Sequence, residues 1–134
     1  MLEKPFAGWV KITFNEEFSF TASYLTDIPN DFVKALTVAL EQNISTAVTI
    51  DGESNGECLI LFNMDDKIVS AIVDTENGKK VYEFVEISPL QFAQNFIEDI
   101  EQNYKSWSYW MCEENYSFDL TPLKKIIKQI SGGN

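Results

Sequence analysis

The sequence predicts an α+β domain in which an antiparallel, multi-stranded sheet carries helices packed on one side. Three observations predict this class: an early hairpin pattern, four further strand patterns joined by short turns, and helical patterns at separate places. The predicted order of elements is ββ-α-ββββ-α-(β)-α. Because the 134 residues contain no repeat and no linker, we expect a single globular domain spanning 1–134.

The first predicted element is a hairpin whose turn is Asn15-Glu16-Glu17. After the turn, apolar and hydroxyl residues alternate with a period of two, which is typical of a half-buried strand. The expected inner positions are Phe18, Phe20, Ala22 and Tyr24, and the expected outer positions are Ser19, Thr21 and Ser23.

A helix is predicted over residues 29–43. Asp27 is placed to cap it, and Pro29 sits in the first turn, where its missing N–H does no harm. Phe32, Leu36 and Leu40 recur at steps of four residues, so we expect this face to pack on the sheet.

Four strands are predicted at 45–51, 57–63, 67–74 and 80–87. Polar turns at 51–56, 64–66 and 76–78 separate them, and the last contains Asn-Gly, the strongest short hairpin signal. These strands should therefore form an antiparallel meander.

Two helices and one ambiguous segment complete the chain. Ser88 and Gln91 form a capping box with Pro at the first helical position, so a second long helix starts here. Residues 107–112 are predicted as a short strand or an aromatic-rich loop. Thr121-Pro122 then opens a final amphipathic helix.

The charge balance restricts the function. Twenty-one acidic residues face ten basic ones, all Lys, and the net charge is −11. This argues against nucleic acid and anionic membrane, because both need dense Lys or Arg. It favours a basic protein partner, although solubility alone also explains an acidic surface.

The absence of His and Arg from the sequence closes most common enzyme classes and His-based metal sites. We therefore expect no enzyme and no cofactor; acid pairs brought together by the fold stay open as a third possibility. The loop 51–56 resembles the start of a calcium loop, but Phe62 stands where a bidentate acid is required. With no export signal visible, we expect a cytoplasmic chain with free thiols at Cys58 and Cys112; the alternative, which their spacing leaves open, is a disulfide between them.

The candidate partner-binding residues combine acids with aromatic anchors, which are enriched where proteins bind one another. For Asp65-Asp66 the alternative is a hairpin tip, and for the Trp residues it is core packing of at least one. The candidates are Asp65, Asp66, Glu98, Asp99, Glu101, Trp107, Trp110, Glu113 and Glu114.

The layout of the chain resembles the immunity proteins of bacterial contact-dependent inhibition systems, especially a whirly-like subgroup. The landmarks are the hairpin ending at 23–25, the helix segment 30–36, the strand start 45–48, and 88–90, which opens the second long helix. The resemblance implies stoichiometric inhibition of one cognate toxin domain, often a nuclease. The alternative is a small acidic secretion chaperone that holds a segment of an effector, and an exposed apolar groove would favour it.

Overall fold

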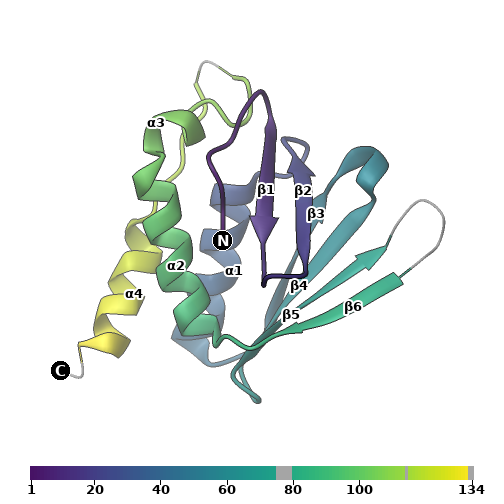
Figure 1. The fold of residues 1–134 in the computed structure, drawn as a ribbon. Coiled ribbons are helices and arrows are strands. Elements are labelled where there is room, and N and C mark those ends of the chain that lie inside the picture. The colour runs from purple at the N-terminus through teal and green to yellow at the C-terminus, as the bar shows by residue number, and fades with distance from the viewer. Residues whose placement is uncertain (75–79, 114, 133–134) are drawn as a thin grey trace.

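The computed structural model describes residues 1–74, 80–113 and 115–132 and confirms the α+β class. The strands form two antiparallel sheets, a two-stranded hairpin and a four-stranded sheet in the order β3-β4-β5-β6. Figure 1 shows α1, α2 and α4 together on one side of the four-stranded sheet. The predicted gathering of helices on one side is therefore confirmed.

The hairpin consists of β1 (Trp9–Thr13) and β2 (Ser19–Ser23). The Asn15 side chain shapes the turn by accepting hydrogen bonds from the amides of Glu17 and Phe18, both at 2.9 Å. Two predicted positions are wrong: Ser23 is buried and Tyr24 is exposed. Ser23 turns inward because its hydroxyl donates to the carbonyl of Asp51 at 3.2 Å.

The first long helix, α1 (Ile28–Gln42), begins where the sequence predicted. Asp27 caps it by accepting from the amide of Asn30 at 3.4 Å, and Asn43 ends it in a left-handed conformation. Tyr116 packs on this start, where its hydroxyl donates to the Asp27 carboxylate at 2.6 Å.

The four-stranded sheet contains β3 (Thr46–Asp51), β4 (Glu57–Asn63), β5 (Ile68–Asp74) and β6 (Lys80–Val85). The bounds agree with the predicted strands to within two residues. The short 3₁₀ helix η1 (Glu53–Asn55) joins β3 to β4. The predicted turn at 76–78 lies outside the described residues.

Four phenylalanines build the centre of the core between α1, α2 and the sheet. Phe32 of α1 lies 5.3 Å from Phe96 of α2 between ring centroids, and Phe62 of β4 lies 5.1 Å from Phe92. All four side chains are fully buried. Such aromatic pairs stabilise the packing by about 0.5–1.5 kcal/mol beyond the area they bury.

After β6, the regular elements of the described chain are all helices. The helix α2 (Pro89–Gln102) is capped by Ser88, whose hydroxyl accepts from the Gln91 amide at 3.1 Å. The helix α4 (Thr121–Ser131) contacts α1 and α2. The short strand that was one alternative for residues 107–112 is wrong. The short helix α3 (Tyr104–Trp107) ends there and successive turns follow it. Trp107 and Trp110, three residues apart, are both buried from this helical turn.

The hairpin docks on the connection between β3 and β4. Asn55 donates from its side chain to the carbonyl of Thr21 at 3.3 Å. Gly52 lies so close to β2 that a Cβ there would be 2.5 Å from Phe20 Cζ and 2.9 Å from Thr21 O. Gly52 is thus required for a close approach between two elements rather than for an unusual backbone angle.

Candidate functional site

A hollow of about 530 Å³ lies between the segment before β1 and the turns after α3. Its wall is mainly apolar, and two aromatic side chains stand exposed at it: Phe6 is 84% exposed and Tyr109 is 69% exposed. Lys4 and Glu113 contribute one charge of each sign. The lining residues are Lys4, Pro5, Phe6, Ala7, Gly8, Ser106, Tyr109, Trp110, Cys112 and Glu113.

One wall of the hollow is a tight turn at Ala7 and Gly8. Both residues have positive φ, 51° and 81°, and Phe6 and Trp9 exchange backbone hydrogen bonds of 2.9 and 3.0 Å across them. The Gly8 carbonyl also accepts from the amide of Tyr24 at 2.8 Å. These bonds hold Phe6 outward although Ala at positive φ is unfavourable.

The opposite wall is the turn region after α3. The amide of Trp110 donates to the carbonyl of Trp107 at 3.0 Å, and the amide of Cys112 donates to the carbonyl of Tyr109 at 3.1 Å. These turns place Trp107 and Trp110 inward while Tyr109 faces solvent. Cys112, with φ of 55°, is exposed at the rim.

Exposed apolar side chains extend from this hollow along the end of the hairpin. Trp9 pairs with Ser23 in the β1–β2 register, and the Tyr24 ring is the neighbour a Cβ at Gly8 would meet. Grouped exposed aromatic residues are typical of protein-binding surfaces. We call this surface the aromatic patch; it consists of Phe6, Trp9, Tyr24, Leu25 and Tyr109.

An acidic row borders the aromatic patch at Leu25. In the strand register Asp51 lies opposite Glu57, and Glu57 lies opposite Asp74, so three carboxylates stand side by side across three strands. Together with Glu53 they surround a second hollow of about 520 Å³ that Leu25 also lines. Asp74 in turn lies opposite Lys80 of β6, and the Asp51 carboxylate accepts from the amide of Glu53 at 2.6 Å. Glu57 has a like charge on each side, an arrangement that is destabilising in a sheet.

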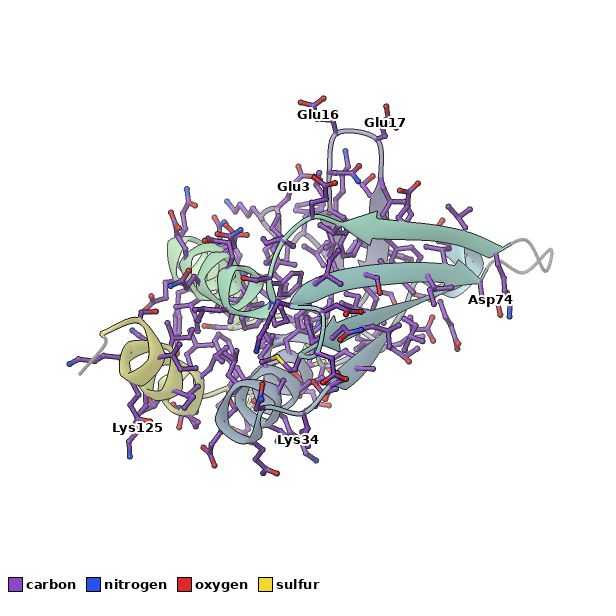
Figure 2. All side chains as sticks on the ribbon, turned by 90° about the horizontal axis from the view of Figure 1, so that it is seen from below. Glu3, Glu16, Glu17, Lys34, Asp74 and Lys125 are labelled. Carbon is purple, nitrogen blue, oxygen red and sulfur yellow. The ribbon has the colours of Figure 1, made fainter. Side chains whose placement is uncertain are left out.

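Carboxylates also project from the rest of the surface. Figure 2 shows Glu16 and Glu17 at the tip of the hairpin and Asp74 at the end of β5, all directed away from the body of the protein. Among the described residues, the only ion pairs between side chains are Lys11–Glu3 at 3.9 Å and Lys124–Glu101 at 2.8 Å. The acids are thus largely left to interact with solvent or a partner.

The structure corrects the assignment of Trp107 and Trp110 to a partner-binding surface. Their side chains are 0% and 1% exposed, and their ring centroids lie 5.2 Å apart in the core. Trp110 donates its indole N–H to the carbonyl of Thr26 at 2.8 Å. The core-packing alternative therefore describes both residues.

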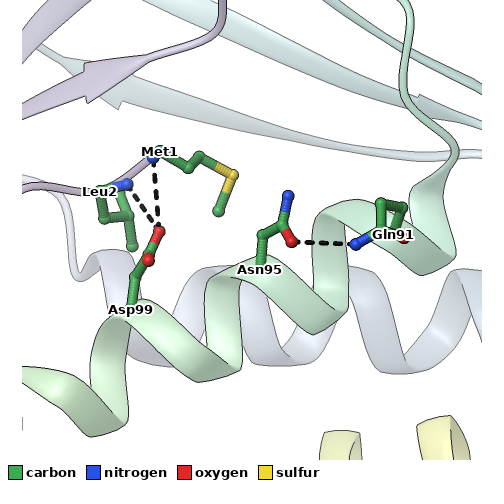
Figure 3. Close-up of polar contacts among 5 residues, drawn as sticks. All are labelled: Met1, Leu2, Gln91, Asn95 and Asp99. Carbon is green, nitrogen blue, oxygen red and sulfur yellow. Dashed lines mark hydrogen bonds and ion pairs between the residues drawn. The ribbon is translucent and has the colours of Figure 1, made fainter.

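The three candidate acids of α2 differ in their surroundings. Asp99 accepts the amide of Leu2 at 2.9 Å and lies 3.6 Å from the amino group of Met1, as Figure 3 shows. Glu101 pairs with Lys124 at 2.8 Å. Glu98 is exposed. Asp99 is thus engaged within the protein, and Gln91 and Asn95, 3.0 Å apart, continue the polar line along the helix (Figure 3).

The remaining candidate acids lie at separate places. Asp65 and Asp66 occupy the turn between β4 and β5, where the Asp66 amide donates to Asn63 at 3.0 Å; the hairpin-tip alternative is correct in its geometry. This turn is at the end of the molecule opposite α3 (Figure 1). Glu113 lines the hollow beside Tyr109. Glu114 lies outside the described residues.

Of the patch residues that are absent from the list of candidates, Tyr109 has a detectable signal in the sequence and Phe6 has none. Trp107 and Trp110 are three residues apart and therefore share one face of a helix or helical turn, which leaves Tyr109 on another face. A helical period applied to this segment predicts Tyr109 at the surface and the two Trp residues in the core. Phe6 has no such signal, because the turn at Ala7 and Gly8 is what directs it outward.

In the described part of the chain no group of three or more His, Cys, Asp or Glu side chains is arranged to hold a metal ion. No described helix combines the length and the apolar character needed to cross a membrane. Comparison of the chain with protein-family models, curated proteins and solved structures found no match.

Proposed function

We propose that this chain is a binding protein that stoichiometrically inhibits a basic protein domain, as an immunity protein does with its cognate toxin. The observation that carries the proposal is the aromatic patch bordered by the acidic row. The patch offers rigid anchors that bury area at low entropic cost. The acidic row offers the complementary charge that speeds association with a basic surface.

A toxin that cleaves nucleic acid needs a positive groove for phosphate. A protein with net charge −11 competes for such a groove, and it inhibits by occupying the groove without turning anything over. The resemblance of the layout to immunity proteins agrees with this mode of action.

The test starts from the immobilised protein and a lysate of the source cell, washed at low and then at high salt. We expect one basic, folded domain to be retained, and we expect one equivalent of the chain to abolish its activity. Retention of no basic protein, or a retained domain whose activity is unaffected, would sink the proposal.

Two charge variants locate the contact. Glu57→Lys and Glu16→Lys each raise the net charge by two, from −11 to −9. Glu57 stands in the middle of the acidic row, whereas Glu16 stands at the far tip of the hairpin (Figure 2). We expect Glu57→Lys to slow association about tenfold and flatten its salt dependence, and Glu16→Lys to act weakly. If both variants slow association equally, the acidic row acts only through the overall charge of the protein and is not the contact.

A secretion chaperone is the second candidate, and the exposure of the aromatic patch is the observation that favours it. A chaperone would retain a disordered segment of an effector rather than a folded domain. Limited proteolysis of the retained partner separates the two functions: a protected compact domain supports inhibition, and a short protected segment in an otherwise digested chain supports the chaperone.

A further inference from the structure

One edge of the four-stranded sheet is open. The strand β3 pairs with β4 only, and the Gly52 amide continues that pairing by donating to the Gly56 carbonyl at 2.7 Å. Because hydrogen-bonding direction alternates along an antiparallel strand, Asp51, Thr49 and Ala47 turn their N–H and C=O groups away from β4. These are the groups that a further strand would contact.

The first of these positions is already satisfied by side chains. The Asp51 amide donates to Thr26 Oγ1 at 2.8 Å, and Ser23 Oγ donates to the Asp51 carbonyl at 3.2 Å. Between residues described by the structure, no hydrogen bond reaches the backbone of Thr49 or Ala47 on this edge. On this edge the backbone groups of Ala47 and Thr49 are therefore open, whereas those of Asp51 are bonded by side chains in the way that a neighbouring strand would bond them.

A groove of about 380 Å³ runs beside this edge, between β3 and α1. Ala35 and Val38 of α1 form its apolar wall, and Val48 contributes from β3. A strand laid on β3 would place alternate side chains into this groove. Backbone pairing and side-chain burial are thus available at one place.

The two edges of the sheet differ in their protection. Natural edge strands are guarded against pairing by charged residues, Pro or bulges. The strand β6, at the other edge, contains Lys80 and Glu83. The open positions of β3 lie in Thr-Ala-Val-Thr, which contains neither charge nor Pro. The unguarded edge is the one beside the groove.

Charge selects the occupant. Asp31 lines the groove, Asp27 caps the same helix, and Asp51 ends β3. Partial burial and the charge of Asp27 raise the pKa of Asp31, and Lys34, which lines the same groove, acts in the opposite direction. The groove itself therefore carries one charge of each sign, and the excess of acid comes from Asp27, Asp51 and the net charge of −11. A second copy of the chain would bring another net charge of −11, whereas a basic segment gains from the acids.

We propose that the partner protein adds an extended, basic segment as a strand to the open edge of β3. The inference rests on the proposed function, because it describes how the inhibited domain is held. The backbone groups of Ala47 and Thr49 bond the added strand, and its apolar side chains enter the groove against Ala35 and Val38. This contact is distinct from the aromatic patch.

The test uses a defined probe, the blocked peptide Thr-Lys-Val-Thr-Val-Lys-Thr, and the same peptide with Glu in place of Lys. We expect the basic peptide to shift the amide resonances of Ala47 and Thr49 and to slow their hydrogen exchange. The acidic peptide should bind about tenfold more weakly.

Two variants of Thr49 distinguish the contribution of its backbone amide to peptide binding from that of its side chain. Thr49→Pro removes an amide that faces away from β4, so it blocks the added strand while leaving the β3–β4 pairing intact. Thr49→Ala keeps the amide. We expect binding to fall about tenfold or more in the Pro variant and to be unchanged in the Ala variant. Should Thr49→Pro not fold, Val38→Lys fills the groove without altering β3 and should give the same loss.

Equal binding by the Pro and Ala variants, resonance shifts confined to the aromatic patch, or no binding at millimolar peptide overturns the proposal. Sedimentation that shows a dimer in the parent protein and a monomer in Thr49→Pro assigns the edge to a second copy and overturns it too. If a retained basic domain binds the Thr49→Pro variant as tightly as the parent, strand addition is refuted and the proposed function stands. If the peptide binds at β3 but no basic domain is retained from the lysate, the proposed function is refuted and the strand site stands.

Discussion

Trp107 and Trp110 lie in the same buried cluster with ring centroids 5.2 Å apart, but the two indoles differ in their hydrogen bonding. Trp110 Nε1 donates to the Thr26 carbonyl at 2.8 Å. Trp107 Nε1 has no partner among the described residues. The two residues therefore form a matched pair for measuring what one buried hydrogen bond contributes to stability.

Trp110→Phe should lower the free energy of unfolding by about 1 kcal/mol more than Trp107→Phe. Both substitutions remove similar volume from the core, but only the first removes a hydrogen bond, and the Thr26 carbonyl then keeps the amide of Ile28 at 2.9 Å as its donor. Urea unfolding of the two variants, with unchanged dependence on urea concentration, measures the difference. Equal losses would mean that the Thr26 bond contributes nothing net.

Asp99→Ala should lower the free energy of unfolding by about 1–2 kcal/mol, because it removes the acceptor of the Leu2 amide at 2.9 Å and the counter-charge of the Met1 amino group. Glu98→Ala, at the exposed neighbouring position, is the control and should stay within about 0.5 kcal/mol of the parent. Chemical unfolding at neutral pH compares them. A loss as small as that of Glu98→Ala would show that this contact is not held in solution.

Gly52→Ala should lower the free energy of unfolding by about 1–3 kcal/mol, because the new methyl group meets Phe20 and the backbone of Thr21 and forces the hairpin away from η1. Ser54→Ala, an exposed position in η1, is the control. Thermal unfolding of both variants checks the effect. A parent-like Gly52→Ala would place the hairpin farther from this turn than the structure has it.

Alkaline pH should destabilise the protein through Cys58. Burial raises the pKa of this thiol from its ordinary value of 9.0 to about 12. Its contribution is therefore fully present below pH 9, and it is lost as the pH rises from 9 toward 12, because only the unfolded thiol ionises there. The loss from this one proton is about 1.4 kcal/mol per pH unit.

The comparison for this prediction is Cys58→Ala, which lacks the titrating group. Its free energy of unfolding should fall less steeply than that of the parent between about pH 9 and pH 11, and the two should run parallel at lower pH. Guanidinium unfolding at a series of pH values measures both slopes. Identical slopes above pH 9 would contradict a buried thiol at this position.

Local patterns were sufficient for most elements. The period-two alternation, the Asp27 and Ser88 caps and the short turns determine strands and helices because these signals act between residues close in sequence. They failed at residues 107–112, where aromatic residues suit strand, loop and helical turn alike. They also failed at Ser23 and Tyr24, where a hydrogen bond to Asp51 overrides the alternation.

The sequence by itself determined the class of the fold, the acidic charge and the absence of His and Arg. Only the tertiary structure decided which side chains are available to a partner. It buries Trp107 and Trp110, exposes Phe6 and Tyr109, and assembles Asp51, Glu57 and Asp74 from three strands. The physical reason is that exposure and charge proximity depend on contacts between residues far apart in the chain, which no local period encodes.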